Sequence, residues 1–108
     1  MAARKTLLIV YHSFTDGTRQ MAEAARAGAT ADEGCTARLL HAAQAGAPDV
    51  LAADGYLFAT PENLAAMSGQ LKDFFDRSYY AVLDRVNGRP YASLICAGSD
   101  GSNAARQV

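Results

Sequence analysis

Three short segments, rich in hydroxyl-bearing, small and acidic residues, are the part of this sequence best suited to bind a ligand. They are residues 13–18, 60–69 and 97–102. In the first segment, Ser13, Thr15 and Thr18 supply hydroxyl groups, and Gly17 allows close approach to the backbone. A helix predicted from Thr18 would present free N–H groups that attract an anion. The pattern indicates a phosphate site with neutral donors, although the same residue types also form ordinary helix N-caps.

Other chemistries lack the residues they need. The first segment holds no Lys or Arg to absorb the charge that develops in phosphoryl transfer. The motif of the P-loop NTPases, G-x-x-x-x-G-K-[ST], is absent. No dinucleotide-binding motif G-x-G-x-x-G follows the first apolar run either. His12 and His41 have no evident partner, so we expect no catalytic side chain. Cys35 and Cys96 are far apart, which indicates buried thiols rather than a disulfide or a metal site.

The elements that must position these segments follow an alternating pattern. Short apolar runs predict four strands, at residues 6–11, 35–40, 55–59 and 91–96. The second run is more polar, which places it near an edge, and residues 60–63 are predicted as a loop. Strands that alternate with helices predict a parallel sheet with helices on both faces. Ligands bind such sheets at the carboxyl ends of the strands, where all three segments lie.

Helices are predicted from Thr18, between residues 67 and 82, and from Asn103. The second helix has the strongest signal, because its apolar residues recur at a period near 3.6. Asn87 and Gly88 are predicted to end it. The residues of this apolar stripe, which we interpret as core, are Met67, Leu71, Phe74, Phe75, Tyr79 and Val82.

Length and charge bound the function further. The 108 residues fit a single domain, residues 1–108, and ten basic and eleven acidic residues give a net charge of −1. No block of like charge appears, which argues against nucleic-acid partners. No apolar stretch approaches the ~20 residues that span a bilayer. The N-terminus lacks the features of a secretory signal, so we expect no membrane association and a cytoplasmic location.

Residues 59–77 resemble a long motif of the flavodoxin-like flavin reductases. In the Trp-repressor-binding-protein type quinone oxidoreductases and the NAD(P)H-dependent FMN reductases, the third strand runs into G-T-P. The motif N-M-S-G-x-[LM]-K-x-F-x-D-R follows after a variable turn. The matching residues here are Thr60-Pro61, Met67-Ser68-Gly69, Leu71-Lys72, Phe74 or Phe75, and Asp76-Arg77. The segment Gly98-Ser99-Asp100-Gly101 is similar to a third flavin-contacting loop of this group.

The resemblance implies a flavodoxin-like α/β fold, a three-layer αβα sandwich with a parallel sheet in the order 2-1-3-4. It also implies that the fifth strand and the last helix are missing, so that the domain is truncated at its C-terminal end. FMN would be the cofactor and NAD(P)H the reductant. The FMN phosphate would be held by Ser13, Phe14, Thr15, Asp16, Gly17 and Thr18. Thr60, Pro61, Glu62 and Asn63 would face the isoalloxazine ring, and Ala97, Gly98, Ser99, Asp100 and Gly101 would cover its other polar edge.

Asp16 departs from the related sequences, which usually read [ST]-x-T-G-x-T and have Gly at its place. A carboxylate that points inward would repel the phosphate, whereas one that points outward is a harmless acid at a helix start. We expect the outward orientation.

The resulting hypothesis is an FMN-dependent oxidoreductase that passes electrons from NAD(P)H to a quinone or a similar small acceptor. The resemblance also implies a homodimer or homotetramer. One alternative is a flavodoxin-type electron carrier without a substrate of its own, although such carriers are generally strongly acidic and this chain is not. The other is a non-enzymatic remnant of the fold, motivated by Asp16 and the truncation.

Overall fold

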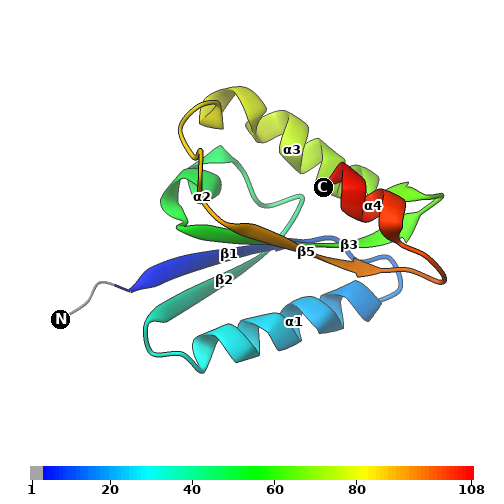
Figure 1. Cartoon of the computed structure of the whole chain (residues 1–108), viewed down its shortest axis with the longest axis horizontal. Coiled ribbons are helices and arrows are strands. Elements are labelled where there is room, and N and C mark those ends of the chain that lie inside the picture. The colour runs from blue at the N-terminus through cyan, green and yellow to red at the C-terminus, as the bar shows by residue number, and fades with distance from the viewer. Residues whose placement is uncertain (1–3) are drawn as a thin grey trace.

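The computed structural model describes residues 4–108, which form three layers (Figure 1). A central sheet lies between helix α1 on one face and helices α2, α3 and α4 on the other. The strands are β1 (Lys5–Tyr11), β2 (Cys35–His41), β3 (Gly55–Asn63), β4 (Ala66–Met67) and β5 (Tyr91–Cys96). The helices are α1 (Gly17–Thr30), α2 (Ala47–Ala52), α3 (Gly69–Val82) and α4 (Ser102–Gln107). Within residues 4–108, no helix is long and apolar enough to cross a membrane.

Parallel pairing orders the four long strands as predicted. β1 pairs with β2 and β3, and β5 pairs with the other side of β3, which gives β2-β1-β3-β5. The predicted order 2-1-3-4 is therefore confirmed, with β5 as its fourth strand. Tyr11 lies beside both His41 and Ala59 in register, and Pro61 lies beside Cys96. The carboxyl ends of these strands consequently meet at one rim of the sheet.

A hairpin replaces the loop predicted at residues 60–63. These residues continue β3 as far as Asn63, and β4 then returns antiparallel, with Met67 opposite Glu62. Leu64 and Ala65 make the turn with φ of 50° and 61°, a left-handed conformation that L-residues seldom adopt. The prediction of a loop was wrong because the segment contains a proline and lacks the central glycine that marks a common hairpin turn.

The bounds of α3 also differ from the prediction. Met67 lies in β4, and α3 begins after Ser68, whose hydroxyl accepts a hydrogen bond from the Leu71 N–H at 3.2 Å. The helix ends at Val82 rather than at residues 87–88. Met67 still packs against the core next to α3, which explains why its spacing looked helical.

The expectation of a missing fifth strand and last helix needs correction. The described chain contains five strands, because the short β4 extends the hairpin of β3, and α4 follows β5. The start of α4 at Ser102 lies one residue before the predicted start at Asn103.

Alternating side chains of the central strand build a core on each face of the sheet. Leu8 and Val10 point into the larger cluster, beneath α2 and α3, where Leu71 and Phe74 also lie. Ile9 points to the opposite face, into a smaller cluster with residues of α1. All of these side chains are buried. Of the stripe predicted for α3, Leu71 and Phe74 are therefore core, and Met67, Phe75 and Val82 are partly buried against it. The prediction is wrong for Tyr79, which is 53% exposed.

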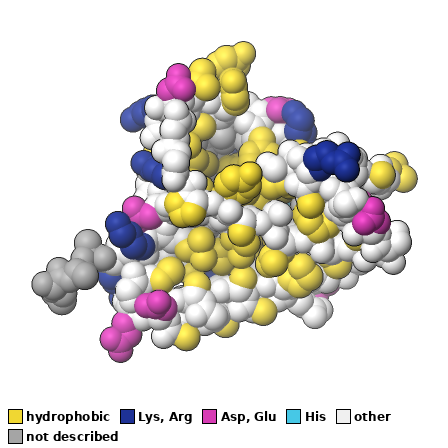
Figure 2. Space-filling view, viewed as in Figure 1, with side chains coloured by type: hydrophobic (Ala, Val, Ile, Leu, Met, Phe, Trp, Pro, Cys, Tyr) yellow, Lys and Arg dark blue, Asp and Glu magenta, His cyan; other side chains and the backbone are white. Residues whose placement is uncertain are grey.

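The edge strand β5 is the least covered part of the sheet. Among the described residues it pairs only with β3, and Tyr91 at its start is 66% exposed. Beside it, a cavity of about 300 Å³ opens between α3 and the sheet, lined mainly by aromatic and aliphatic side chains such as Phe75, Tyr79 and Val82. Figure 2 shows hydrophobic side chains gathered across the middle of this face, with charged groups at its margins.

Replacing Phe74 by Ala tests the larger core. Phe74 is 1% exposed, so truncation would leave a cavity and lower the free energy of unfolding by about 3–5 kcal/mol. The matched control is Tyr80→Ala on the same helix, where the ring is 85% exposed and the expected change is below about 0.5 kcal/mol. Urea denaturation followed by circular dichroism measures both, and equal losses would contradict this account of the core.

Candidate functional site

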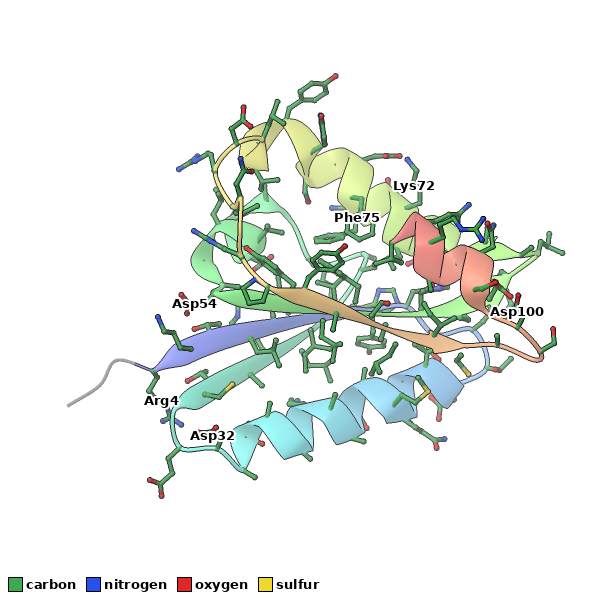
Figure 3. All side chains as sticks on the ribbon, viewed as in Figure 1. Arg4, Asp32, Asp54, Lys72, Phe75 and Asp100 are labelled. Atoms are coloured by element: carbon green, nitrogen blue, oxygen red, sulfur yellow. The ribbon has the colours of Figure 1, made fainter. Side chains whose placement is uncertain are left out.

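The three predicted segments meet at the rim formed by the strand ends. The His12 N–H donates to the Ala59 carbonyl at 3.2 Å, which joins the residue before the first segment to β3. A Cβ placed on Gly17 would lie only 3.2 Å from Cys96 Sγ, so the start of α1 packs against the end of β5. Figure 3 shows Asp100 at this rim, whereas Arg4, Asp32 and Asp54 lie at the opposite end of the molecule.

The first segment has the features of an anion site. The Gln20 N–H bonds to the Asp16 carbonyl at 3.1 Å, so the N–H groups before it have no helical partner. Ser13 Oγ is shielded from solvent and has no hydrogen-bond partner in the protein. A buried hydroxyl without a partner is costly, and together with the free N–H groups it favours a bound anion. Thr18 is buried beside them, while Phe14 and Thr15 are exposed.

Asp16 is held by its own helix. Its carboxylate accepts hydrogen bonds from Arg19 Nε at 2.5 Å and Nη2 at 2.8 Å, and from Gln20 Nε2 at 3.3 Å. These bonds, above all the one from Arg19, lower the pKa of Asp16 from 3.8 to about 2. The backbone of Asp16 has a φ of 78°, which glycine adopts at no cost. The conformation therefore accounts for the glycine that related sequences carry here.

Two histidines lie behind the first segment. The centroids of the His12 and His41 rings are 5.5 Å apart. They lie close together because His12 follows β1 directly and His41 is the last residue of the neighbouring strand β2. His12 is 9% exposed, and burial, followed by the proximity of His41, lowers its pKa, which favours the neutral form. His12 Nδ1 is buried without a partner, whereas His41 Nδ1 accepts from the Ala43 N–H at 3.0 Å. Sequence reasoning missed this pair, although parallel pairing of the first two strands could have indicated it.

The second segment uses most of its side chains to hold the hairpin. Thr60 is fully buried; its hydroxyl donates to the Pro61 carbonyl and accepts from the Ser68 N–H, both at 2.9 Å. The Glu62 carboxylate accepts from the third segment, through the Gly101 N–H at 3.1 Å. Pro61 and Asn63 are half-buried and remain accessible at the rim. The predicted ring contacts of residues 60–63 stay predictions.

The third segment is an exposed loop that closes on a buried glycine. Residues 97–100 are exposed, whereas Gly101 is buried with a φ of 79°. A Cβ on Gly101 would lie 3.2 Å from Ile95 Cγ2 and 3.3 Å from Ala97 Cβ, so a larger residue would be crowded as well as strained by the positive φ. The loop can therefore offer its backbone to a ligand at the rim.

The charged end of the long motif has a structural role. Asp76 pairs with Lys72 at 2.5 Å, on the outer side of α3. Arg77 pairs with Asp73 and donates to the Ala42 carbonyl at 2.8 Å, which ties α3 to the segment after β2. Asp76 and Arg77 therefore do not pair with each other: Asp76 pairs with Lys72, and Arg77 pairs with Asp73.

Comparison with known proteins places these features in a family. The profile of the family described as NADPH-dependent FMN reductase matches residues 20–108. A curated relative, a flavodoxin from Aquifex aeolicus (strain VF5), is 33% identical over 95 residues, which cover 88% of this chain and 51% of the relative. The chain thus spans about half the length of the curated relative it matches.

Solved structures share the fold. A flavodoxin from the domain Archaea superposes with a TM-score of 0.80 at 19% identity, covering 94% of this chain and 68% of the other. A WrbA-like flavodoxin from Agrobacterium tumefaciens gives a TM-score of 0.77 at 24% identity, covering 95% and 68%. The predicted flavodoxin-like α/β fold is confirmed by these superpositions.

The ion pair at the start of α1 gives a test of this site. In Arg19→Gln the pKa of Asp16 should rise from about 2 most of the way to 3.8, as measured by an NMR titration of the carboxyl group. Because the folded pKa lies below the unfolded one, the pair stabilises the protein fully above about pH 4, and this contribution is lost as the pH falls to about 2. Arg26→Gln, on the same helix, is the control and should leave the titration unchanged. An Asp16 pKa that stays near 2 without Arg19 would show that another group holds it.

Proposed function

Because the chain belongs to the family of NADPH-dependent FMN reductases, we propose that its rim binds FMN and serves electron transfer from NAD(P)H to a quinone or a similar small acceptor. The observation that carries this proposal is the unpaired Ser13 hydroxyl beside the free N–H groups of α1. The residues present suit a phosphate monoester, which needs such donors and an approach free of bulky side chains.

Charge at the rim also suits a cofactor that stays bound. The cation nearest to the first segment in sequence, Arg19, is paired with Asp16 and with Glu23, at 2.5 Å and 2.9 Å. Neutral donors are therefore left to meet the phosphate, and the negative charge of Asp16 is offset. The lowered pKa of His12 keeps that imidazole neutral, so it adds neither a full charge nor a strong acid behind the phosphate.

The other two segments would orient the flat ring. The half-buried Pro61 and Asn63 and the exposed backbone of residues 97–100 form two neighbouring walls of the rim. Backbone N–H and carbonyl groups in such walls can hydrogen-bond the polar edge of a flavin. FMN supplies the redox chemistry itself when bound, so the site requires no protein acid or base.

A flavodoxin-type carrier is the second candidate, favoured by the 33% identity to a flavodoxin. The two candidates share the cofactor and differ in whether NAD(P)H is oxidised steadily.

If the reductase is the right candidate, the FMN-loaded protein should oxidise NADPH continuously with a soluble benzoquinone. The rate should be proportional to the protein concentration and above that of the same concentration of free FMN. Loss of NADPH absorbance measures this rate. Bound flavin without such turnover would favour the carrier.

Ser13→Ala tests the phosphate site. Loss of one hydrogen bond to a charged group should weaken FMN binding by about tenfold or more, because such bonds contribute about 1.5–3 kcal/mol. Quenching of flavin fluorescence measures the affinity. Ser78→Ala is the matched control: its hydroxyl is also buried without a partner, but it lies on α3, away from the rim. If both variants bind FMN like the wild type, the phosphate is not held by Ser13.

A further inference from the structure

We propose that Glu62 is a positioning residue whose carboxylate fastens the 97–101 loop to the β3–β4 hairpin, so that the two walls of the ring site keep a fixed spacing. This inference rests on the proposed FMN site. It assigns Glu62 to the neighbouring loop rather than to direct contact with the ring.

Both oxygens of the carboxylate bind the start of α4. Glu62 Oε1 accepts from the Gly101 N–H and Oε2 from the Ala104 N–H, each at 3.1 Å. Gly101 is the N-cap of α4, so these are two of the amides that have no partner inside the helix. A carboxylate at this end of a helix is also favoured by the helix dipole.

Two more hydrogen bonds join α4 to the same hairpin. Asn103 Nδ2 donates to the Ala65 carbonyl, and the Met67 N–H donates to Gln107 Oε1 at 2.9 Å. The helix has only six residues and buries only Ala104, too little to hold its own position. The hairpin therefore holds α4, and Glu62 makes the contact nearest to the exposed loop.

The side chain must be a glutamate to do this fully. Glutamine has one acceptor oxygen, which can serve only one of the two backbone N–H groups. Its NH2 group would lie against the other N–H, and two donors cannot bond to each other. Aspartate is one methylene shorter and would not reach both amides from β3. Bonding to the helix start also offsets the negative charge of Glu62 beside the proposed ring.

The test combines a measurement without ligand and one with FMN. Hydrogen exchange of the Gly101 and Ala104 amides, followed by NMR, should quicken about tenfold or more in Glu62→Ala and less in Glu62→Gln. FMN affinity should fall in the same order, and the visible circular dichroism of bound FMN should change, because the loop no longer fixes the ring. Glu33→Gln, in the exposed turn after α1, is the matched control and should change neither measurement.

The outcomes separate the two proposals. Unchanged exchange in both Glu62 variants would overturn the fastening role, whatever happens to FMN. Faster exchange with unaltered affinity and dichroism would overturn the positioning role. Failure of the wild-type protein to bind FMN would refute the proposed function and the positioning role with it, while exchange would still decide whether Glu62 fastens the loop. Glu62→Gln keeps one acceptor, so it tests the idea even if Glu62→Ala does not fold.

Discussion

Parallel pairing around β1 is the constraint on which the rest of this molecule depends. Because β2, β1, β3 and β5 run the same way, segments as far apart in the sequence as residues 13–18 and 97–102 arrive at one rim. The pairing in turn depends on β1 being buried on both faces, by Leu8 and Val10 on one side and Ile9 on the other. A shift of one residue in the register of β1 would move each set of side chains to the opposite face of the sheet. The strand ends would then no longer align at one rim.

Much of this arrangement could be predicted from the sequence, because it follows from strong apolar patterns. Continuous apolar runs predicted the four long strands, and the 59–77 motif indicated the family, which the match to residues 20–108 confirms. The order of the strands followed from the resemblance to that family. The β3–β4 hairpin could not be predicted, because Leu64 and Ala65 adopt left-handed backbone without the glycine or asparagine that marks such turns. The contacts of Glu62 with α4 could not be predicted either, since they depend on tertiary packing that no local spacing encodes.

Asp16 shows how a local departure from a family pattern is accommodated. The position needs a left-handed backbone, for which glycine is best suited, and the carboxylate adds charge beside the proposed anion site. Arg19, one turn along the helix, binds that carboxylate and keeps it ionised at low pH. The substitution changes the distribution of charge at the rim more than its shape.

The open edge of the sheet has a consequence for how the protein behaves at high concentration. The other edge, β2, carries Arg38, which pairs with Asp49, and a charge of this kind discourages strands of neighbouring molecules from adding to a sheet. Residues 91–96 of β5 include neither a charge nor a proline, and an apolar cavity lies next to them. An uncovered edge of this kind offers unpaired N–H and carbonyl groups to strands of other chains. When two molecules of this protein meet, pairing at β5 would therefore be favoured over pairing at β2.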